Sequence, residues 1–313
     1  MTLGRAVIAV GGNTLTTEDQ VGTWLQIAAN AEAIVAPLAQ LVQNGWQVAV
    51  VHGNGPQVGN LAIQQEAGRE QVPAQPLYQL CAMTQGQLGS VLVRAIDRHC
   101  GHGTAVAVVT HVRVDPQDPA FAAPAKPIGP FFDAQRAPAL AAERGWILTE
   151  DSGRGYRRVV ASPRPVEVIE MRAIRTLLDA GQVVLAAGGG GVAVGADLVG
   201  IDAVIDKDHA AAALATAVGA TELYLLTGVD CVFLDFGTAR QRPVHALTPA
   251  QAEQHLADGH FLPGSMGPKV SAALCFLQAG GRRVIITSAG LLAAAAAGTP
   301  GVGTVIESAH PVT

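Results

Sequence analysis

His52-Gly-Asn-Gly-Pro-Gln-Val-Gly59 directly follows Val48-Ala-Val-Val51, a short apolar run of the kind that forms a buried parallel strand. The same succession occurs at Gly11-Gly-Asn13, after the run 5–10, and at the four glycines 188–191, after the run 182–187. In open α/β sheets, ligands lie beyond the carboxyl ends of the strands. Glycine there lets backbone N–H groups approach an anion without a Cβ in the way. The sequence therefore predicts a parallel sheet with an anion-binding edge.

Apolar runs of strand length alternate with amphipathic stretches along most of the chain. The predicted strands are 5–10, 46–51, 104–110, 182–187, 222–227 and 283–287. The predicted helices are 23–44, 77–100, 168–180, 207–218, 248–258 and 267–280. This alternation predicts βαβ units and a mainly parallel sheet that is covered by helices on both faces.

The segment 111–165 breaks this rhythm. It is rich in proline and alanine, contains Asp-Pro twice, and is too long for a simple loop. We interpret it as an insertion with small strands of its own. Because Lys126 belongs to it, the insertion is expected to act as a lid and not as a linker.

Size and composition limit the classes of protein that this chain can represent. With 313 residues, of which 49% are hydrophobic and 14% charged, it can form one large α/β domain or two lobes. A net charge of −5 without a long basic run argues against a nucleic-acid surface. We expect no signal peptide, because the sequence does not open on a charged segment followed by an apolar one. No apolar run is expected to reach the length that spans a bilayer. We therefore expect a cytoplasmic protein that binds neither membranes nor nucleic acids. Its four cysteines are expected to be reduced thiols: Cys81, Cys100, Cys231 and Cys275.

The basic residues are strongly unequal, because seventeen are arginine and only three are lysine. Lys126, Lys207 and Lys269 each lie in a segment dense in glycine, proline or aspartate. An ammonium is a compact charge on a thin stem, whereas a guanidinium is a wide planar fork. Three retained lysines in such surroundings indicate a crowded site for small anionic oxygens, such as those of a transferring phosphoryl group.

Two nucleotide-binding motifs are absent from the sequence. Neither the P-loop G-x-x-x-x-G-K-[ST] nor the dinucleotide fingerprint G-x-G-x-x-G occurs, so a Walker NTPase and a standard Rossmann dehydrogenase are not indicated. His52 could act as a base, but its place directly after a strand favours a structural hydrogen bond. No other histidine shows a metal-ligand spacing.

Taken in order, these motifs resemble the carbamate kinases of the amino acid kinase superfamily. The resemblance covers residues 5 to 309 and rests most strongly on H-G-N-G-P-Q-V-G at 52–59 and G-S-M-G-P-K at 264–269. Further matching segments are Gly11–Asn13, Lys126–Gly129, Glu150–Arg158, Gly188–Gly191 and Ala203–Asp208.

The resemblance implies a three-layer αβα sandwich with two lobes and a protruding subdomain. The N-terminal lobe, residues 1–210, would bind carbamate and carry the subdomain at about 111–165. The C-terminal lobe, residues 211–313, would bind the nucleotide. The enzyme would be a homodimer that transfers phosphoryl reversibly between carbamoyl phosphate and ADP with Mg²⁺, commonly in arginine breakdown. The apolar helix 77–100 could contribute to the dimer interface.

The resemblance also implies roles for individual residues. Lys207 and Lys269 would stabilise the transferring phosphoryl group, Asp208 would position the lysines, and Lys126 would reach in from the subdomain. Backbone and amide donors of five residues would hold the small substrate: Gly11, Gly12, Asn13, Gly53 and Asn54. The nucleotide pocket would be lined by Thr227, Asp230, Phe233, Met266 and Gly267. No protein ligand to a metal is implied.

Two segments depart from the family pattern. Val192-Ala-Val194 stands where Ile-Pro-Val is expected, which would loosen a turn without removing a chemical group. Gly228 and Cys231 lie in a nucleotide-side loop that often carries bulkier or polar residues.

The chemistry of carbamate agrees with the absence of an evident general base. Carbamate is already an anion, so phosphoryl transfer to it needs positioning and fixed positive charge rather than deprotonation. Three alternatives stay open at this point: a kinase for another small carboxylate or phosphate, a non-catalytic nucleotide or carbamoyl phosphate sensor, and a redox enzyme with an atypical dinucleotide loop.

Overall fold

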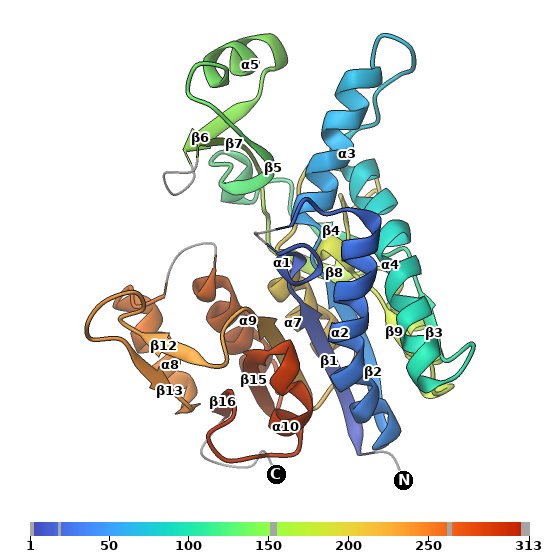
Figure 1. Ribbon diagram of the computed structural model, residues 1–313, viewed down its shortest axis with the longest axis vertical. Helices are drawn as coiled ribbons and strands as arrows, with labels where there is room; N and C mark the ends of the chain where they lie inside the picture. Colours follow the sequence, from blue (N-terminus) through green and yellow to red (C-terminus); the bar gives the residue numbers. More distant parts are fainter. Residues whose placement is uncertain (1–2, 18–19, 151–154, 262–264, 308–313) are drawn as a thin grey trace.

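The computed structural model describes residues 3–17, 20–150, 155–261 and 265–307 (Figure 1). The α-helices are α1 Gly12–Leu15, α2 Trp24–Gln43, α3 Gly55–Gly68, α4 Leu77–Cys100, α5 Ala137–Arg144, α6 Met171–Asp179, α7 Lys207–Val218, α8 Pro249–Ala257, α9 Met266–Gln278 and α10 Leu292–Ala296. The strands are β1 Gly4–Val10, β2 Trp46–His52, β3 Ala105–Ala107, β4 His111–Val114, β5 Lys126–Phe132, β6 Ile147–Glu150, β7 Tyr156–Val160, β8 Pro165–Val168, β9 Val183–Leu185, β10 Val192–Val194, β11 Glu222–Thr227, β12 Val232–Leu234, β13 Arg242–Val244, β14 Ala246–Leu247, β15 Arg283–Ser288 and β16 Thr304–Glu307. Short 3₁₀ turns are η1 Pro119–Phe121, η2 Gly188–Gly190 and η3 Ala289–Leu291.

An eight-stranded sheet forms the centre of the molecule, in the order β14-β16-β15-β11-β1-β2-β9-β3. All neighbouring pairs are parallel except β15 and β16, which are antiparallel. Each of the six predicted strands is present in this sheet. Two of them are shorter than predicted, since β3 and β9 cover only the first or central part of the apolar runs.

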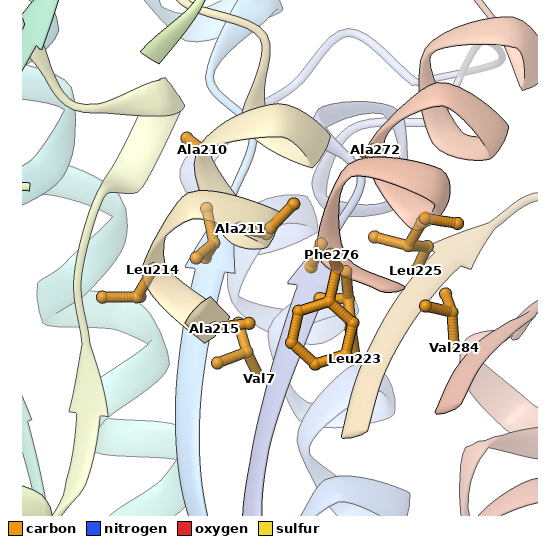
Figure 2. Close-up of a cluster of buried hydrophobic side chains, with 14 of the residues drawn as sticks. Val7, Ala210, Ala211, Leu214, Ala215, Leu223, Leu225, Ala272, Phe276 and Val284 are labelled. Atoms are coloured by element: carbon orange, nitrogen blue, oxygen red, sulfur yellow. The ribbon is translucent and has the colours of Figure 1, made fainter. Parts of the chain in front are cut away.

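Successive residues of the central strands point to opposite faces of the sheet, and both faces are buried. Ile8, Val48 and Val50 pack in one cluster against α2 and α4. Val7 and Ala49 pack in another cluster against α7 and α9 (Figure 2). Burial on both faces explains why these strands are apolar throughout instead of alternating. The predicted three-layer α/β sandwich is confirmed.

All six predicted helices are present, and three of them, α2, α7 and α8, begin at a residue whose side chain caps the helix. Thr23 and Thr248 each form a capping box with a glutamine three residues later, at the beginning of α2 and α8. The helix α3 was not predicted, because its first turn is Gly55-Pro56 and resembles a loop. Proline is nevertheless favourable at this position, since the first N–H groups of a helix have no intrahelical partner.

The insertion has small strands of its own, as predicted. β5, β7 and β6 form an antiparallel sheet that, with α5, stands apart from the central sheet in Figure 1. The ends of the segment behave differently: β4 and β8 form a second three-stranded sheet with β10. Because β10 is Val192–Val194, the prediction that these residues form a loosened turn is wrong. They form a buried strand, paired in parallel with β4.

The helix α2 corrects the expectation that no apolar run is long enough to span a bilayer. Over its 20 residues it is long and apolar enough to span a bilayer by length and composition. Its buried residues, among them Ile27, Ile34 and Leu38, instead pack in the core cluster that includes β1 and β2. The apolar composition of α2 is therefore explained by its burial in the hydrophobic core.

The central sheet runs without interruption through both proposed lobes, because β1 pairs directly with β11. The proposed boundary at residue 210 falls within α7. The division into a carbamate lobe and a nucleotide lobe stays a prediction.

Candidate active site

The loops after β1 and β2 meet at the carboxyl edge of the sheet. A Cβ atom on Gly53 would lie 2.6 Å from the backbone nitrogen of Gly12 and 3.0 Å from Cδ of Lys207. Only glycine permits this approach, because such distances are shorter than ordinary carbon contacts. The predicted convergence of the first two glycine motifs is confirmed, and it brings the Lys207 stem to the same place.

Two of the three lysines share one buried carboxylate. The Nζ atom of Lys207 lies 2.5 Å from Oδ1 of Asp208, and Nζ of Lys269 lies 2.9 Å from Oδ2. Lys207 and Asp208 begin α7, whereas Lys269 lies in the first turn of α9. The Asp208 side chain is 4% exposed, so it is held almost entirely by these two ammonium groups. Asp208 therefore fixes the spacing of two positive charges.

The third lysine reaches the same helix terminus from the subdomain. Nζ of Lys126 lies 2.6 Å from Oδ2 of Asp206, the N-cap residue of α7. The other oxygen of Asp206 accepts hydrogen bonds from the backbone N–H groups of Asp208 and His209. Nδ1 of His209 lies 3.3 Å from Oδ1 of Asp206, and its Nε2 lies 3.2 Å from Oγ of Ser271 on α9. Asp206 thus connects the subdomain to the glycine edge.

Asp206 was not predicted as a functional residue. A local signal for it exists, because aspartate directly before a helix is a favoured N-cap. What the sequence does not show is that one carboxylate oxygen caps α7 while the other holds a lysine from a segment 80 positions away.

The pKa values of this cluster reflect burial and mutual attraction. Burial lowers the pKa of Lys207 to about 8, although Asp208 opposes the shift. For Lys269, burial acts downward, but the Asp208 and Asp206 carboxylates and the hydrogen bonds of the cluster together outweigh it, so the pKa of Lys269 is raised. Burial acts upward on both aspartates and is again outweighed by lysines, which lower the pKa of Asp208 and hold the pKa of Asp206 well below its usual value. Both carboxylates are therefore ionised at neutral pH, and Lys207 is the ammonium nearest to losing its proton.

The third glycine cluster has a packing role. A Cβ on Gly188 would lie 2.3 Å from Nε2 of His52, and one on Gly189 would lie 2.2 Å from Nδ2 of Asn54. A Cβ on Gly190 would lie 2.2 Å from the carbonyl oxygen of Ile205. These glycines admit neighbouring protein groups, so the expectation that they open backbone N–H groups to an anion is not supported by their surroundings.

His52 has the structural surroundings that its position favoured. Its ring is buried, and Nδ1 lies 3.1 Å from the carbonyl oxygen of Gly53. Burial lowers the pKa of His52 to about 4, despite that hydrogen bond. The imidazole is therefore neutral at physiological pH.

Several predicted substrate-binding groups lie at this edge. Gly11 is the N-cap of α1, and Gly12 and Asn13 form its start, although the side chain of Asn13 lies outside the described residues. The Asn54 amide is buried and donates a hydrogen bond of 2.9 Å to Oγ1 of Thr84. Gln57, which was not predicted, donates to Thr16 at 3.0 Å, and its buried Oε1 has no hydrogen-bond partner among the described residues.

Paired glycines hold the subdomain against α3. A Cβ on Gly59 would lie 2.0 Å from Cα of Gly129, which itself has a φ of +74°. The carbonyl oxygen of Gly129 accepts a hydrogen bond from Nε of Arg157 at 3.0 Å. On the same helix, Glu66 forms an ion pair with Arg144 of the subdomain. Two motifs far apart in sequence therefore share one backbone contact, which sets the position of Lys126 at the start of β5.

The predicted nucleotide-side residues fall into two groups. Thr227 ends β11, the carbonyl oxygen of Asp230 accepts a hydrogen bond from Thr287, and Phe233 lies in β12. Met266 and Gly267 instead lie in the first turn of α9 with Lys269. Of the motif residues, 151–154 and 262–264 lie outside the described residues. Among the described residues, no hydrogen bond or ion pair joins Thr227, Asp230 or Phe233 to the lysine cluster.

Comparison with known proteins points to one family. The sequence model of the amino acid kinase family matches residues 4–288 of this chain. A carbamate kinase from Pyrococcus horikoshii is 41% identical over 291 residues, which cover 90% of this chain and 93% of the relative. Carbamate kinase 2 of Enterococcus faecalis is 43% identical, with the same coverage.

Solved structures give the same result. Carbamate kinase from Giardia lamblia bound to citric acid is 37% identical and covers 97% of this chain and 98% of its own, with a TM-score of 0.91. The same enzyme bound to AMP-PNP superposes with a TM-score of 0.88. The chain belongs to the amino acid kinase family and, within it, to the carbamate kinases.

Proposed function

We propose that this chain transfers a phosphoryl group reversibly between carbamoyl phosphate and ADP, giving carbamate and ATP. The observation that carries the proposal is the cluster in which Asp208 holds Lys207 and Lys269, and Asp206 holds Lys126, beside the Gly12–Gly53 contact. The similarity to carbamate kinases over nine-tenths of the chain supports the same reaction.

In the direction of ATP formation, an oxygen of the ADP β-phosphate attacks phosphorus of carbamoyl phosphate. The bond from phosphorus to the carbamoyl oxygen breaks, and its electron pair leaves on carbamate. Neither step requires removal of a proton, since attacking and leaving oxygens are both anionic. The protein must therefore bring two anions together and stabilise the charge on the phosphoryl group between them.

The site residues divide this work. Lys207 and Lys269 stabilise the phosphoryl oxygens, and Asp208 keeps the two ammonium groups in place. Lys126 contributes a third charge from the subdomain, with Asp206 as its positioning residue. The main chain at Gly11, Gly12, Asn13, Gly53 and Asn54 holds the small substrate. The nucleotide lies along Thr227, Asp230, Phe233, Met266 and Gly267.

Mg²⁺ fits this site as an ion that arrives with the nucleotide. Asp206 and Asp208 are both already engaged by lysine ammonium groups, so neither is a free carboxylate ligand. Mg²⁺ is commonly bound through substrate phosphates and water, and when bound it neutralises phosphate charge. We assign no protein ligand to it.

We further propose that the enzyme is a cytoplasmic homodimer that serves arginine breakdown. Exposed Met83 on α4 is in keeping with a contribution of that helix to the dimer interface. Light scattering coupled to size-exclusion chromatography would show twice the chain mass of 32.0 kDa. A monomer at micromolar concentration would overturn the dimer.

The decisive assay mixes purified protein with Mg²⁺, ADP and fresh carbamoyl phosphate and follows ATP with luciferase. The matched control is Lys269→Ala, which should lower kcat on the order of 10²–10³-fold, comparable to loss of an oxyanion donor. Circular dichroism of the variant checks that it is folded. ATP formation that persists in the control would remove Lys269 from the chemistry.

The same preparation separates the alternative functions. In the reverse direction, carbamate, aspartate and acetylglutamate are compared as phosphoryl acceptors. A larger acceptor that outcompetes carbamate would overturn the proposal. Folded protein that binds ATP without turnover on any of them would be a sensor.

A further inference from the structure

We propose that His255, Asp258 and His260 form a binding site for a transition-metal dication of the Zn²⁺ class, separate from the phosphoryl-transfer site. His255 lies in the last turn of α8, Asp258 caps the helix, and His260 follows two residues later. Each offers one ligand atom, and these atoms all lie within 4.8 Å of one another. The fold therefore brings two imidazoles and a carboxylate to one place at the end of a helix, although the spacing of the histidines predicted no metal site.

A second observation is an unpaired nitrogen in this group. Nδ1 of His255 is buried and has no hydrogen-bond partner among the described residues. Buried polar atoms nearly always have a hydrogen-bond partner. An unpaired buried nitrogen therefore indicates a missing partner, such as an ion. The rings of His255 and His260 lie 5.3 Å apart at 81°, so their faces are not stacked on each other.

Neighbouring side chains can orient two of the ligands. Nδ1 of His260 lies 3.4 Å from Oδ1 of Asp235, directly after β12. A carboxylate beside one ring nitrogen is the usual way in which proteins orient a metal-binding histidine, whose other nitrogen then coordinates. Oδ1 of Asp258 accepts a hydrogen bond of 2.9 Å from Gln254, which leaves Oδ2 for an ion.

The ligand set selects the class of ion. Two imidazoles with one carboxylate suit Zn²⁺, Co²⁺, Ni²⁺ or Cu²⁺, whereas Mg²⁺ and Ca²⁺ prefer oxygen ligands. Zn–N bonds of about 2.0–2.1 Å in a tetrahedron place ligand atoms about 3.4 Å apart. Ligand atoms within 4.8 Å of one another are close to this spacing, and Asp258 is exposed, so that its side chain can adjust to an ion. A water molecule would complete the coordination.

The site would connect two segments of the C-terminal half of the chain. Asp258 and His260 precede Phe261 and the segment that leads into α9, while Asp235 follows β12. A bound ion would connect the end of α8, through His260 and Asp235, to the β12–β13 hairpin. We therefore expect binding to stabilise this region without supplying a reacting group.

The test is a calorimetric titration of chelator-treated, tag-free protein with Zn²⁺ in the absence of nucleotide. We expect one equivalent to bind with a Kd in the micromolar range or tighter and to raise Tm. His255→Gln and His260→Gln should each weaken binding on the order of 10-fold or more. His102→Gln is the matched control, because His102 is exposed in the loop after α4 and lies outside the site. Mg²⁺ should not bind to the stripped protein at the same concentration.

The visible spectrum of a Co²⁺ complex reports the coordination number of the ion, and its intense four-coordinate bands should be lost in the histidine variants. Should either histidine variant unfold, Asp235→Asn offers a second variant, which should also weaken binding. Zn²⁺ affinity that is unchanged in both histidine variants would overturn the proposal, as would the absence of a bound equivalent. Loss of affinity in the His102 control alone would assign the ion to another surface and also overturn it.

Discussion

Lys207 is the residue whose charge depends most on its surroundings. Burial lowers its pKa to about 8, so it is an ammonium at neutral pH and loses its charge when the pH rises above 8. Lys269, paired with the same carboxylate, has a raised pKa and stays charged over this range. The pH dependence of the reaction should therefore follow Lys207.

We expect kcat/KM for carbamoyl phosphate to be steady between about pH 6.5 and 7.5, and to fall about tenfold per unit well above pH 8, since kcat/KM reports the free enzyme. The descending limb of kcat should lie at higher pH, because a bound anion stabilises the ammonium. Initial rates measured with luciferase, corrected for spontaneous decay of carbamoyl phosphate, would show both limbs. A flat profile up to pH 10 would contradict the role of Lys207.

Lys126 tests whether a compact charge is required. Its Nζ lies 2.6 Å from Asp206, which caps α7 at the site. We expect Lys126→Arg to lower kcat on the order of 10²-fold, because the wider guanidinium displaces the charge from the position set by Asp206. The reverse exchange Arg113→Lys, in an exposed ion pair with Glu167, should leave kcat unchanged. Full turnover in Lys126→Arg would show that any cation suffices there.

At the scale of elements, the contact between α3 and β5 positions the subdomain. A Cβ on Gly59 would lie 2.0 Å from Cα of Gly129, so neither backbone has room for it. The α3 helix begins in the loop that contacts Lys207, and β5 begins at Lys126. The contact between Gly59 and Gly129 therefore sets the position of Lys126 on β5 relative to Lys207 on α7.

Gly59→Ala should separate α3 from β5 and lower kcat on the order of 10²-fold, because displacement of a catalytic group by about 1 Å has an effect of this size. Gly68→Ala, in the last turn of the same helix, is the matched control and should not reduce activity, because its new Cβ would meet only Cγ2 of Val72 at an ordinary 3.9 Å. Melting curves of both variants separate a local shift from loss of the fold. Normal kcat in a folded Gly59→Ala would mean that this contact does not position Lys126.

At the scale of the whole molecule, one hydrophobic cluster joins the two proposed lobes. Val7 of β1, in the first proposed lobe, shares it with four residues of the second: Leu214, Leu223, Phe276 and Val284 (Figure 2). Because the sheet is also continuous from β2 through β15, the two halves bury each other's apolar surface. We expect the lobes to unfold together.

Differential scanning calorimetry should therefore show one main transition with equal calorimetric and van't Hoff enthalpies per cooperative unit. Phe276→Ala should lower the free energy of unfolding by about 3–5 kcal/mol and shift that whole transition. The matched exchange Phe236→Ala, on a side chain that is 51% exposed, should have a much smaller effect. Two resolved transitions divided near residue 210 would instead support independent lobes.

The sequence by itself determined the central strands, the main helices and the three lysines. These follow from local rules, since continuous apolar runs bury on both faces of a sheet and capping residues begin helices. It also placed the glycine loops after β1 and β2 at one edge, because parallel strands end on the same side. The α3 helix was missed where a Gly-Pro start resembles a loop, and β10 was taken for a turn.

Only the tertiary structure decided which groups meet. It turned the glycines of 188–190 towards His52, Asn54 and Ile205, gave Asp206 its lysine partner, and placed Gly59 against Gly129. It also brought His260 beside Asp235. These contacts join residues far apart along the chain, and whether a glycine faces a ligand or a neighbouring side chain depends on packing that no local pattern encodes.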